Sequence, residues 1–195
     1  MIWESTPWKD GLLSDADKLA SMNVANEQAA VEFEKTIFIA AMAIRKLMEA
    51  KKLTDSVASV NLKCTRVPLR KGGRIPDLGN WHRVDEFYDY TDASDGTITL
   101  RSFTNQLIHS YIFGPITADA GGKLVGFFVT SDTERKRHLY EFDIDEITKV
   151  LRLVGNDHVV RSVQTRDADG QWIVKNYGPR DPEIEEARAG QLAID

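Results

Sequence analysis

Hydrophobic and polar positions along the chain first indicate a long helix, from about residue 26 to residue 52. Glutamates gather towards its start, and Lys51 and Lys52 stand at its end, which is the arrangement that the helix dipole favours. The run from Ile37 to Ile44 is apolar on every side of such a helix. We therefore expect this helix to lie centrally, covered by other elements or by another subunit.

Alternating positions predict the strands. Val60, Leu62 and Cys64 alternate with polar residues, which is typical of a strand with one buried face. Asp169 and Gly170 form a pair that favours a tight hairpin between the last two strands. Further strands are predicted at residues 123–131, 138–143, 158–166 and 171–177.

Two shorter helices complete the pattern. Apolar residues recur on one helical face over about 100–112, and Thr99 stands where it can cap the start. Asp143 and Glu146 have the spacing of a capping box, and Gly155 follows as a stop signal. These signals predict a second and a third helix.

The order of these elements predicts an α+β fold, because strands joined by short turns favour antiparallel pairing. We expect a mostly antiparallel sheet of about five strands with three helices packed on it, the long apolar helix being the first. Residues 1–24 are predicted to form an N-terminal arm that docks its tryptophans on the domain, and residues 178–195 a charged C-terminal tail. Between them, residues 25–177 form a single domain, in which 68–96 is an irregular segment.

Composition limits the classes of function. The 195 residues carry a net charge of −5, which argues against bulk electrostatic capture of nucleic acid or of an anionic membrane, although a local basic patch can still bind either. The single cysteine, Cys64, has no internal partner, and no secretory signal or membrane-spanning run is present. We therefore expect a cytoplasmic protein without membrane attachment.

The stretch NQLIHSYIF places an amide and an imidazole in one row on the second predicted helix. Arg101, Asn105 and His109 follow one another at four-residue spacing. One interpretation is an anion site in which His109 transfers a proton, since imidazole suits that role near neutral pH. The other, which we favour, is that Asn105 and His109 hydrogen-bond to neighbouring backbone at the packing edge of the helix.

A basic loop is the second candidate site. Arg70, Lys71 and Arg74 surround two glycines that would let the backbone approach a phosphate, although the P-loop pattern is absent. Trp81 and His82 follow in the same irregular segment, and an indole there could stack on a base or a sugar. The structural alternative is a solvated loop. The histidines are too scattered to predict a metal site, and no motif predicts a cofactor.

These observations lead to two functional hypotheses. The first is a non-catalytic binding or assembly protein that contacts a protein partner or a copy of itself, with a small anionic ligand as a further expectation. The second is a small metal-independent enzyme, a ribonuclease or another phosphoester hydrolase, using His109 with Arg101 and Asn105. Nucleic-acid binding without chemistry is the least favoured, because the chain is acidic.

Overall fold

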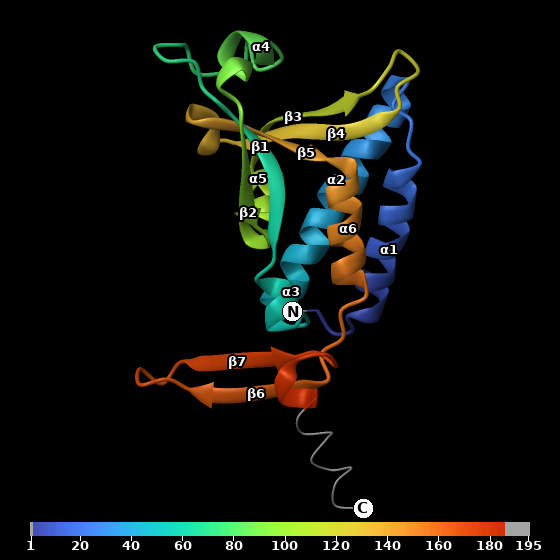
Figure 1. The fold of residues 1–195 in the computed structure, drawn as a ribbon, viewed down its shortest axis with the longest axis vertical. Helices are drawn as coiled ribbons and strands as arrows, with labels where there is room; N and C mark the ends of the chain where they lie inside the picture. Colours follow the sequence, from blue (N-terminus) through green and yellow to red (C-terminus); the bar gives the residue numbers. More distant parts are fainter. Residues whose placement is uncertain (1, 186–195) are drawn as a thin grey trace, which may run out of the picture.

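Helices and two antiparallel sheets make up residues 2–185, which are the residues that the structure, a computed structural model, describes (Figure 1). The α-helices are α1 (Thr6–Ala20), α2 (Glu27–Glu49), α3 (Asp55–Ala58), α4 (Val84–Phe87), α5 (Leu100–Ile108) and α6 (Ile144–Gly155). The strands are β1 (Asn61–Pro68), β2 (Ser94–Thr99), β3 (Ser110–Thr117), β4 (Leu124–Ser131), β5 (His138–Asp143), β6 (Arg161–Arg166) and β7 (Trp172–Tyr177). Two 3-10 turns are η1 (Tyr90–Asp92) and η2 (Glu134–Lys136).

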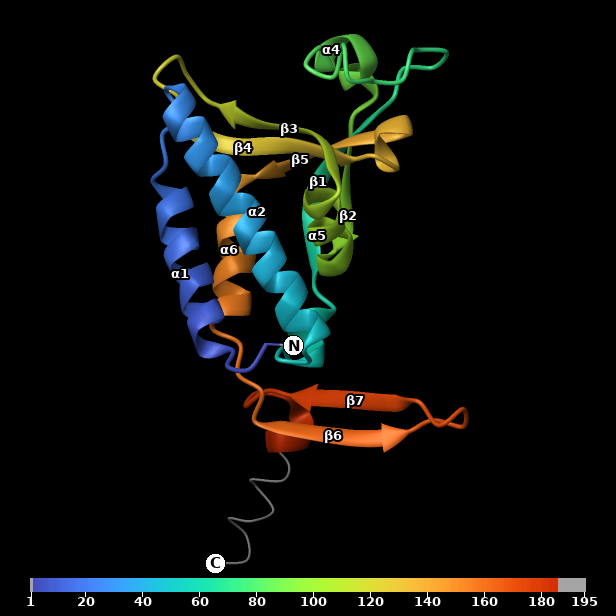
Figure 2. The same ribbon diagram turned by 180° about the vertical axis from the view of Figure 1, so that it is seen from behind.

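The main sheet has five strands in the order β2-β1-β5-β4-β3, and all neighbours are antiparallel. This confirms the predicted α+β class and the antiparallel five-stranded sheet. Its membership differs from the prediction, because β2 and β3 form the two edges while the hairpin β6–β7 forms a separate two-stranded sheet. The hairpin lies beyond one end of the helices and is called the ribbon below (Figures 1 and 2).

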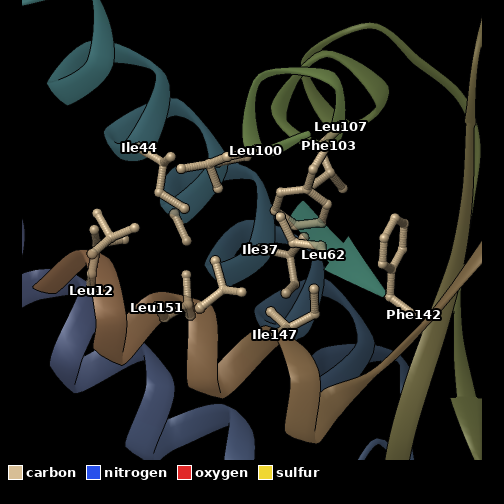
Figure 3. Packing of buried hydrophobic residues seen from close by; sticks show 14 of the residues in the cluster. Leu12, Ile37, Ile44, Leu62, Leu100, Phe103, Leu107, Phe142, Ile147 and Leu151 are labelled. Atoms are coloured by element: carbon tan, nitrogen blue, oxygen red, sulfur yellow. The ribbon is translucent and has the colours of Figure 1, made fainter. Parts of the chain in front are cut away.

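One hydrophobic core joins the helices to one face of this sheet. Leu12 of α1, Ile37 of α2, Leu107 of α5 and Leu151 of α6 are buried and belong to the same cluster as Phe142 of β5. Figure 3 shows side chains of these elements converging from both sides of the core. Burial of this apolar surface is the main favourable term in folding.

The helices depart from the prediction in number and in order. The structure has more than the predicted three, and the first is α1, inside the segment predicted as an arm. Its core-facing positions, Leu12, Ala16 and Leu19, recur with a helical period, which is typical of a helix packed on a core and not of an arm. The indole of Trp3 is 89% exposed instead of docked.

The long helix is α2, and it is the second helix of the chain. Asn26 caps it by accepting a hydrogen bond from Ala29 N (2.9 Å). Its apolar middle is not covered on every side, since Ile39 is 62% exposed and Met42 is also exposed. The prediction of a long apolar first helix was therefore wrong in its position, and the covering of α2 is incomplete within residues 2–185.

Two local predictions failed at element ends. The helix predicted over 100–112 ends at Ile108, because the chain turns into the edge strand β3, which pairs with β4. Asp143 precedes α6 as expected, but its side chain makes no capping hydrogen bond. Glu146 instead accepts a hydrogen bond from Lys63 N (3.0 Å), so it ties α6 to β1.

The irregular segment covers part of the second face of the sheet. Phe87 and Tyr88 are buried in a small cluster with Val67, Ile112 and Leu139. A short strand was considered near Val84–Tyr90, whereas the structure shows the helical turn α4 there. The rest of this face is open.

The ribbon is attached to the body through Asn176 and the chain that enters and leaves it. Asn176 Nδ2 donates to the carbonyls of Lys51 and Leu53, both at 2.9 Å. Of the predicted tail, residues 186–195 lie outside the described residues. Among residues 2–185, no helix is long and apolar enough to cross a membrane.

Candidate functional site

The row of Arg101, Asn105 and His109 does not converge on a cavity that these side chains line. Asn105 is half-buried, and its Oδ1 accepts a hydrogen bond from Arg45 Nη1 (2.7 Å), which ties α5 to α2. His109 is exposed and stands one residue beyond α5, where its backbone carbonyl accepts from Asp132 N (3.1 Å). Arg101 is exposed. None of the three lines any of the four cavities described below.

The basic loop is held by its own acidic neighbours. Arg70 donates to the Asp85 carbonyl (3.3 Å), and its guanidinium lies 3.8 Å from Asp89 Oδ1. Lys71, Arg74, Trp81 and His82 are exposed, and the rings of Trp81 and His82 meet edge to face at 6.1 Å. The structure therefore brings Trp81 and His82 together, but it ties Arg70 to the segment around α4.

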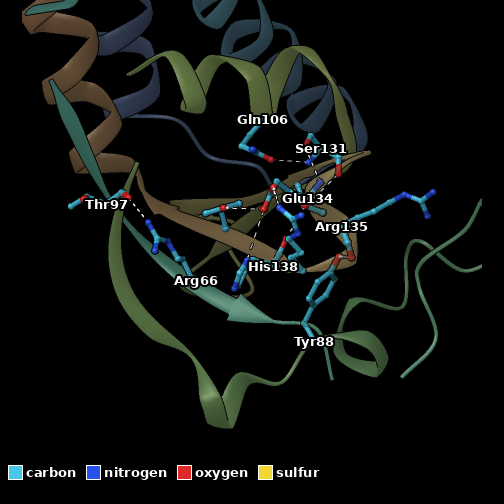
Figure 4. A network of polar contacts seen from close by, with 11 residues as sticks. Arg66, Tyr88, Thr97, Gln106, Ser131, Glu134, Arg135 and His138 are labelled. Atoms are coloured by element: carbon cyan, nitrogen blue, oxygen red, sulfur yellow. Dashed lines mark hydrogen bonds and ion pairs between the residues drawn. The ribbon is translucent and has the colours of Figure 1, made fainter. Parts of the chain in front are cut away.

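A polar network around η2 satisfies itself (Figure 4). Gln106 Oε1 accepts from Ser131 N (2.9 Å), and Tyr88 OH donates to the Arg135 carbonyl (3.0 Å). The Arg135 guanidinium donates to the Pro76 carbonyl. Because these donors and acceptors pair with one another, the network fastens the turn and the 70–83 loop to the sheet.

The open face of the sheet carries the cavity of largest volume among the four, about 780 Å³. It is lined by Lys63, Cys64, Thr65, Asp95, Gly96, Thr97, Ile116, Glu141, Phe142 and Asp143. Burial raises the pKa of Glu141, the hydrogen bond from Tyr90 lowers it, and the charge of Asp143 raises it. The lining mixes both signs of charge, with Lys63 beside three carboxylates, so it selects no single ligand chemistry.

A cavity between the helices and the ribbon has a more selective lining, and we call it the lysine cavity. Its volume is about 580 Å³, and it lies where α1 begins and α2 ends. It is lined by Ser5, Lys9, Ala50, Lys51, Lys52, His158, Val159, Ser162, Gln164, Val174 and Asn176. Three of these residues are lysines and none of the described lining residues is acidic, so the cavity favours an anion.

Lys9 is the most constrained of the three lysines. It is 5% exposed, and its Nζ donates to the backbone carbonyl of Asp157 (2.5 Å). Burial lowers the pKa of Lys9, the charge of Asp157 raises it, and the charge of Lys52 lowers it. The two ammonium groups therefore repel each other, and an anion between them would relieve that repulsion.

Asp157 supplies a negative charge close to the cavity but is already engaged. Its carboxylate accepts hydrogen bonds from Thr54 N and from Thr54 Oγ1, both at 2.8 Å. These bonds fix the start of α3 beneath the ribbon. The charge of Asp157 offsets that of one lysine, so the three lysines keep a net positive charge next to the cavity.

Asn176 lines the cavity and carries a buried acceptor without a partner among the described residues. The residue is 2% exposed, and its Nδ2 faces two carbonyls, which can only accept hydrogen bonds, so the orientation of the amide is determined. Asn176 Oδ1 is buried and has no hydrogen-bond partner among the described residues. Buried acceptors normally have a hydrogen-bond donor as partner.

The N-terminus of α1 adds to the attraction for anions. Ser5 is its N-cap residue, lies on the cavity wall and makes no side-chain capping bond. The first turn of a helix presents backbone N–H groups and the positive end of the helix dipole. Combined with the lysines, it completes a site suited to a phosphate or carboxylate group.

Sequence reasoning missed this site because its residues come from three distant segments. Lys51 and Lys52 were interpreted as charges that stabilise the end of α2, and Lys9 fell in the predicted arm. Pro7 at the first turn of α1 was the signal that a helix starts there. Nothing in the sequence indicated that the ribbon folds against these two helix ends.

The two remaining cavities lie on the outer surface of α1 and α2. One is an apolar groove of about 250 Å³, lined by Pro7, Trp8, Gly11, Leu12, Asp15, Ile39 and Ala43. The other, about 370 Å³, carries residues of both charges and lies next to the groove, sharing Asp15 and Ile39 with it. Together they form the α1–α2 surface.

No group of three or more His, Cys, Asp or Glu side chains in residues 2–185 is placed to hold a metal ion. Comparison with protein-family models, with curated proteins and with solved structures gives no match.

Proposed function

We propose that this is a non-catalytic binding protein whose lysine cavity takes a small phosphate-bearing anion. The observation that carries the proposal is the lining: Lys9, Lys51 and Lys52 face one cavity at the N-terminus of α1, with no acidic residue in the lining. A phosphate group accepts hydrogen bonds from ammonium and backbone N–H groups and neutralises their charge.

The unpaired acceptor of Asn176 restricts the chemical class of the ligand. Asn176 Oδ1 needs a donor, and a phosphate ester of a hydroxylated compound carries hydroxyl groups that can donate to it. The ligand class that fits both features is a sugar phosphate or a nucleotide. Binding would also join the ribbon to the helices, since Ser162 and Gln164 line the same cavity.

Calorimetric titration with phosphate and pyrophosphate tests the proposal. We expect Lys52→Gln to weaken binding about fivefold, as loss of roughly 1 kcal/mol of charge attraction should. Lys149→Gln is the matched control, because Lys149 is an exposed helical lysine of α6 outside the lysine cavity, and the substitution should leave the affinity unchanged. Equal affinity for the parent and Lys52→Gln, or no binding at all, would contradict the proposal.

A second candidate function is self-assembly through the α1–α2 surface. Ile39 is 62% exposed and lines the apolar groove with Trp8, which is also exposed. Large exposed apolar side chains that line one groove are typical of an interaction surface. This supports the assembly hypothesis more specifically than the composition of α2 did.

A second copy of this chain is the occupant that fits this surface. Lys18 of α1 and Glu32 of α2 form an ion pair at 2.8 Å beside the groove, and Asp15 and Lys35 extend the two rows. A surface that carries both signs of charge beside an apolar groove can pair with a copy of itself about a two-fold axis. We therefore propose a homodimer.

Sedimentation velocity tests the dimer. Ile39→Glu should convert it to a monomer, because a carboxylate would be buried in the apolar groove without a partner. Ile173→Glu is the matched control, since Ile173 is an exposed isoleucine on the ribbon. A monomeric parent, or a dimer lost in Ile173→Glu but kept in Ile39→Glu, would overturn this assignment.

A further inference from the structure

We infer that the ligand of the lysine cavity is a single-stranded nucleic acid, whose backbone phosphate lies in the cavity and whose base stacks on Trp172 of the ribbon. This inference rests on the proposed function and names its ligand. It depends on three further observations: the faces of the ribbon, the exposure of Trp172 and the charge of the strands.

The register of the ribbon places Trp172 on the same face as the cavity. Ser162 pairs with Asn176, Gln164 with Val174, and Arg166 with Trp172. Because alternate residues of a strand share a face, these three pairs lie on one face. The first two pairs are the ribbon residues that line the lysine cavity, so the third pair continues the same surface outwards.

Trp172 is arranged as a stacking platform. The Arg166 guanidinium lies 4.5 Å from the centroid of the indole and covers one side of it. The residue nevertheless remains 61% exposed. Aromatic rings with one open face are the sites at which single-stranded nucleic acids stack their bases, and arginine strengthens such sites.

Positive charge on the Trp172 face of the ribbon comes from Arg166. Arg161 and Lys175 lie on the opposite face, and Asp167 and Asp169 stand in the turn between the strands. Lys51 and Lys52 add positive charge on the other side of the lysine cavity, although the chain has a net charge of −5. A local basic surface on an acidic protein directs a polyanion to one place.

The separation of the two subsites favours a strand over a single nucleotide. From the Ser162–Asn176 pair to the Arg166–Trp172 pair is four residues, or about 13 Å along an antiparallel strand. A phosphodiester chain offers phosphates and bases repeatedly over such a length. An unpaired base is required, because base faces inside a duplex are already stacked.

Fluorescence anisotropy with a labelled single-stranded oligonucleotide of about 12 nucleotides tests the inference. We expect Trp172→Ala to raise its Kd at least tenfold and Trp172→Phe to raise it less, because phenylalanine keeps an aromatic face. Trp81→Ala is the competing variant: Trp81 is an exposed tryptophan of the 68–96 segment, and a rise in Kd there as large as in Trp172→Ala would overturn the inference. Lys52→Gln should lower the slope of log Kd against log salt by about 0.7.

The arms of the experiment separate this inference from the proposed function. Trp172→Ala should bind inorganic phosphate as the parent does, since the indole lies outside the lysine cavity. Phosphate binding by the parent without tighter binding of the strand would overturn the inference and keep the proposed function. Tighter binding of a mononucleotide or of a duplex, or an unchanged Kd in Trp172→Ala, would also overturn it. Absence of both phosphate and strand binding would overturn both.

Discussion

At the scale of single residues, two buried polar groups hold the ribbon and α3 against the helices. Asn176 donates hydrogen bonds that join the ribbon to the segment after α2. The Asp157 carboxylate accepts hydrogen bonds from Thr54 at the start of α3. Removing one partner of such a pair leaves the other buried without a hydrogen bond, which is costly. These residues place Lys9 and Lys52 next to the ribbon and so create the lysine cavity.

The residues of the Arg101 row should differ in their effect on stability. Asn105→Ala should lower the free energy of unfolding by about 1 kcal/mol, because it removes the acceptor of Arg45 Nη1 at a half-buried position. His109→Ala should stay within about 0.5 kcal/mol of the parent, since its side chain is exposed. Urea denaturation of the two variants measures both, and a larger loss in His109→Ala than in Asn105→Ala would contradict the structure.

Glu141 should make stability depend on pH. Burial raises its pKa above the ordinary value of 4.5, so the folded state binds this proton more tightly than the unfolded state does. The free energy of unfolding then decreases as pH rises from the ordinary pKa of a glutamate through the raised pKa of Glu141. Glu141→Gln removes this loss, and its stability relative to the parent should increase between about pH 4 and about pH 7. Denaturation at both pH values measures the difference, and a constant difference would contradict the assigned cause.

At the scale of elements, the β3–β4 hairpin is fastened to the linker between α1 and α2. Val24 N donates to the Gly122 carbonyl (2.7 Å), and Leu124 N donates to the Met22 carbonyl (3.3 Å). Gly122 has φ +81°, and a Cβ there would lie 2.6 Å from Ala25 N. The turn therefore needs glycine both for its conformation and for the close approach of the linker.

Substitution of alanine for each of two glycines separates the effect of the backbone conformation from the effect of the close approach. Gly122→Ala should lower the free energy of unfolding by more than about 2 kcal/mol, because strain and a backbone clash add together. Gly72→Ala is the control: Gly72 also has a positive φ, +70°, but nothing lies within 4 Å of the added Cβ, so only about 1 kcal/mol should be lost. Equal losses in thermal or chemical denaturation would show that the linker does not press on the turn.

At the scale of the whole molecule, the two sheets differ in how they are supported. The five-stranded sheet packs on the helices, whereas residues of β6 and β7 are mostly exposed on both faces. A two-stranded sheet is marginally stable by itself in water. The ribbon therefore depends on its attachment at Asn176 and on any ligand in the lysine cavity.

Hydrogen exchange should reveal this difference. Backbone amides of β6 and β7 should exchange faster than those of β1, β4 and β5, because local opening of the ribbon exposes little apolar surface. Addition of pyrophosphate should slow exchange in the ribbon if the proposed site joins it to the helices. Mass spectrometry of peptides from the two sheets measures both effects. Equal protection of the ribbon and the main sheet would show that the ribbon is not a separate unit.

The sequence predicted the elements whose periodicity or turn chemistry is clear within the element itself. Alternation at Leu62 and Cys64 correctly indicated β1, and the periodic stripe after Asp143 indicated α6. The helix predicted over 100–112 extended wrongly into the start of β3, because Tyr111 continues the helical period of Leu107. Pairing of β3 with β4 decided between helix and strand there, and such pairing outweighs local propensity.

By itself, the sequence determined the α+β class, the antiparallel sheet, the approximate residue range of α2 and the turn at Gly170. These follow from periodicity and from turn chemistry, which act over a few residues. Only the tertiary structure decided that the last hairpin leaves the main sheet and folds against the ends of α1 and α2. That arrangement brings Lys9, Lys52 and Asn176 to one cavity. The reason is physical: charge and hydrogen-bond partners of a buried site act through space, and positions far apart in the chain carry no local signal of their meeting.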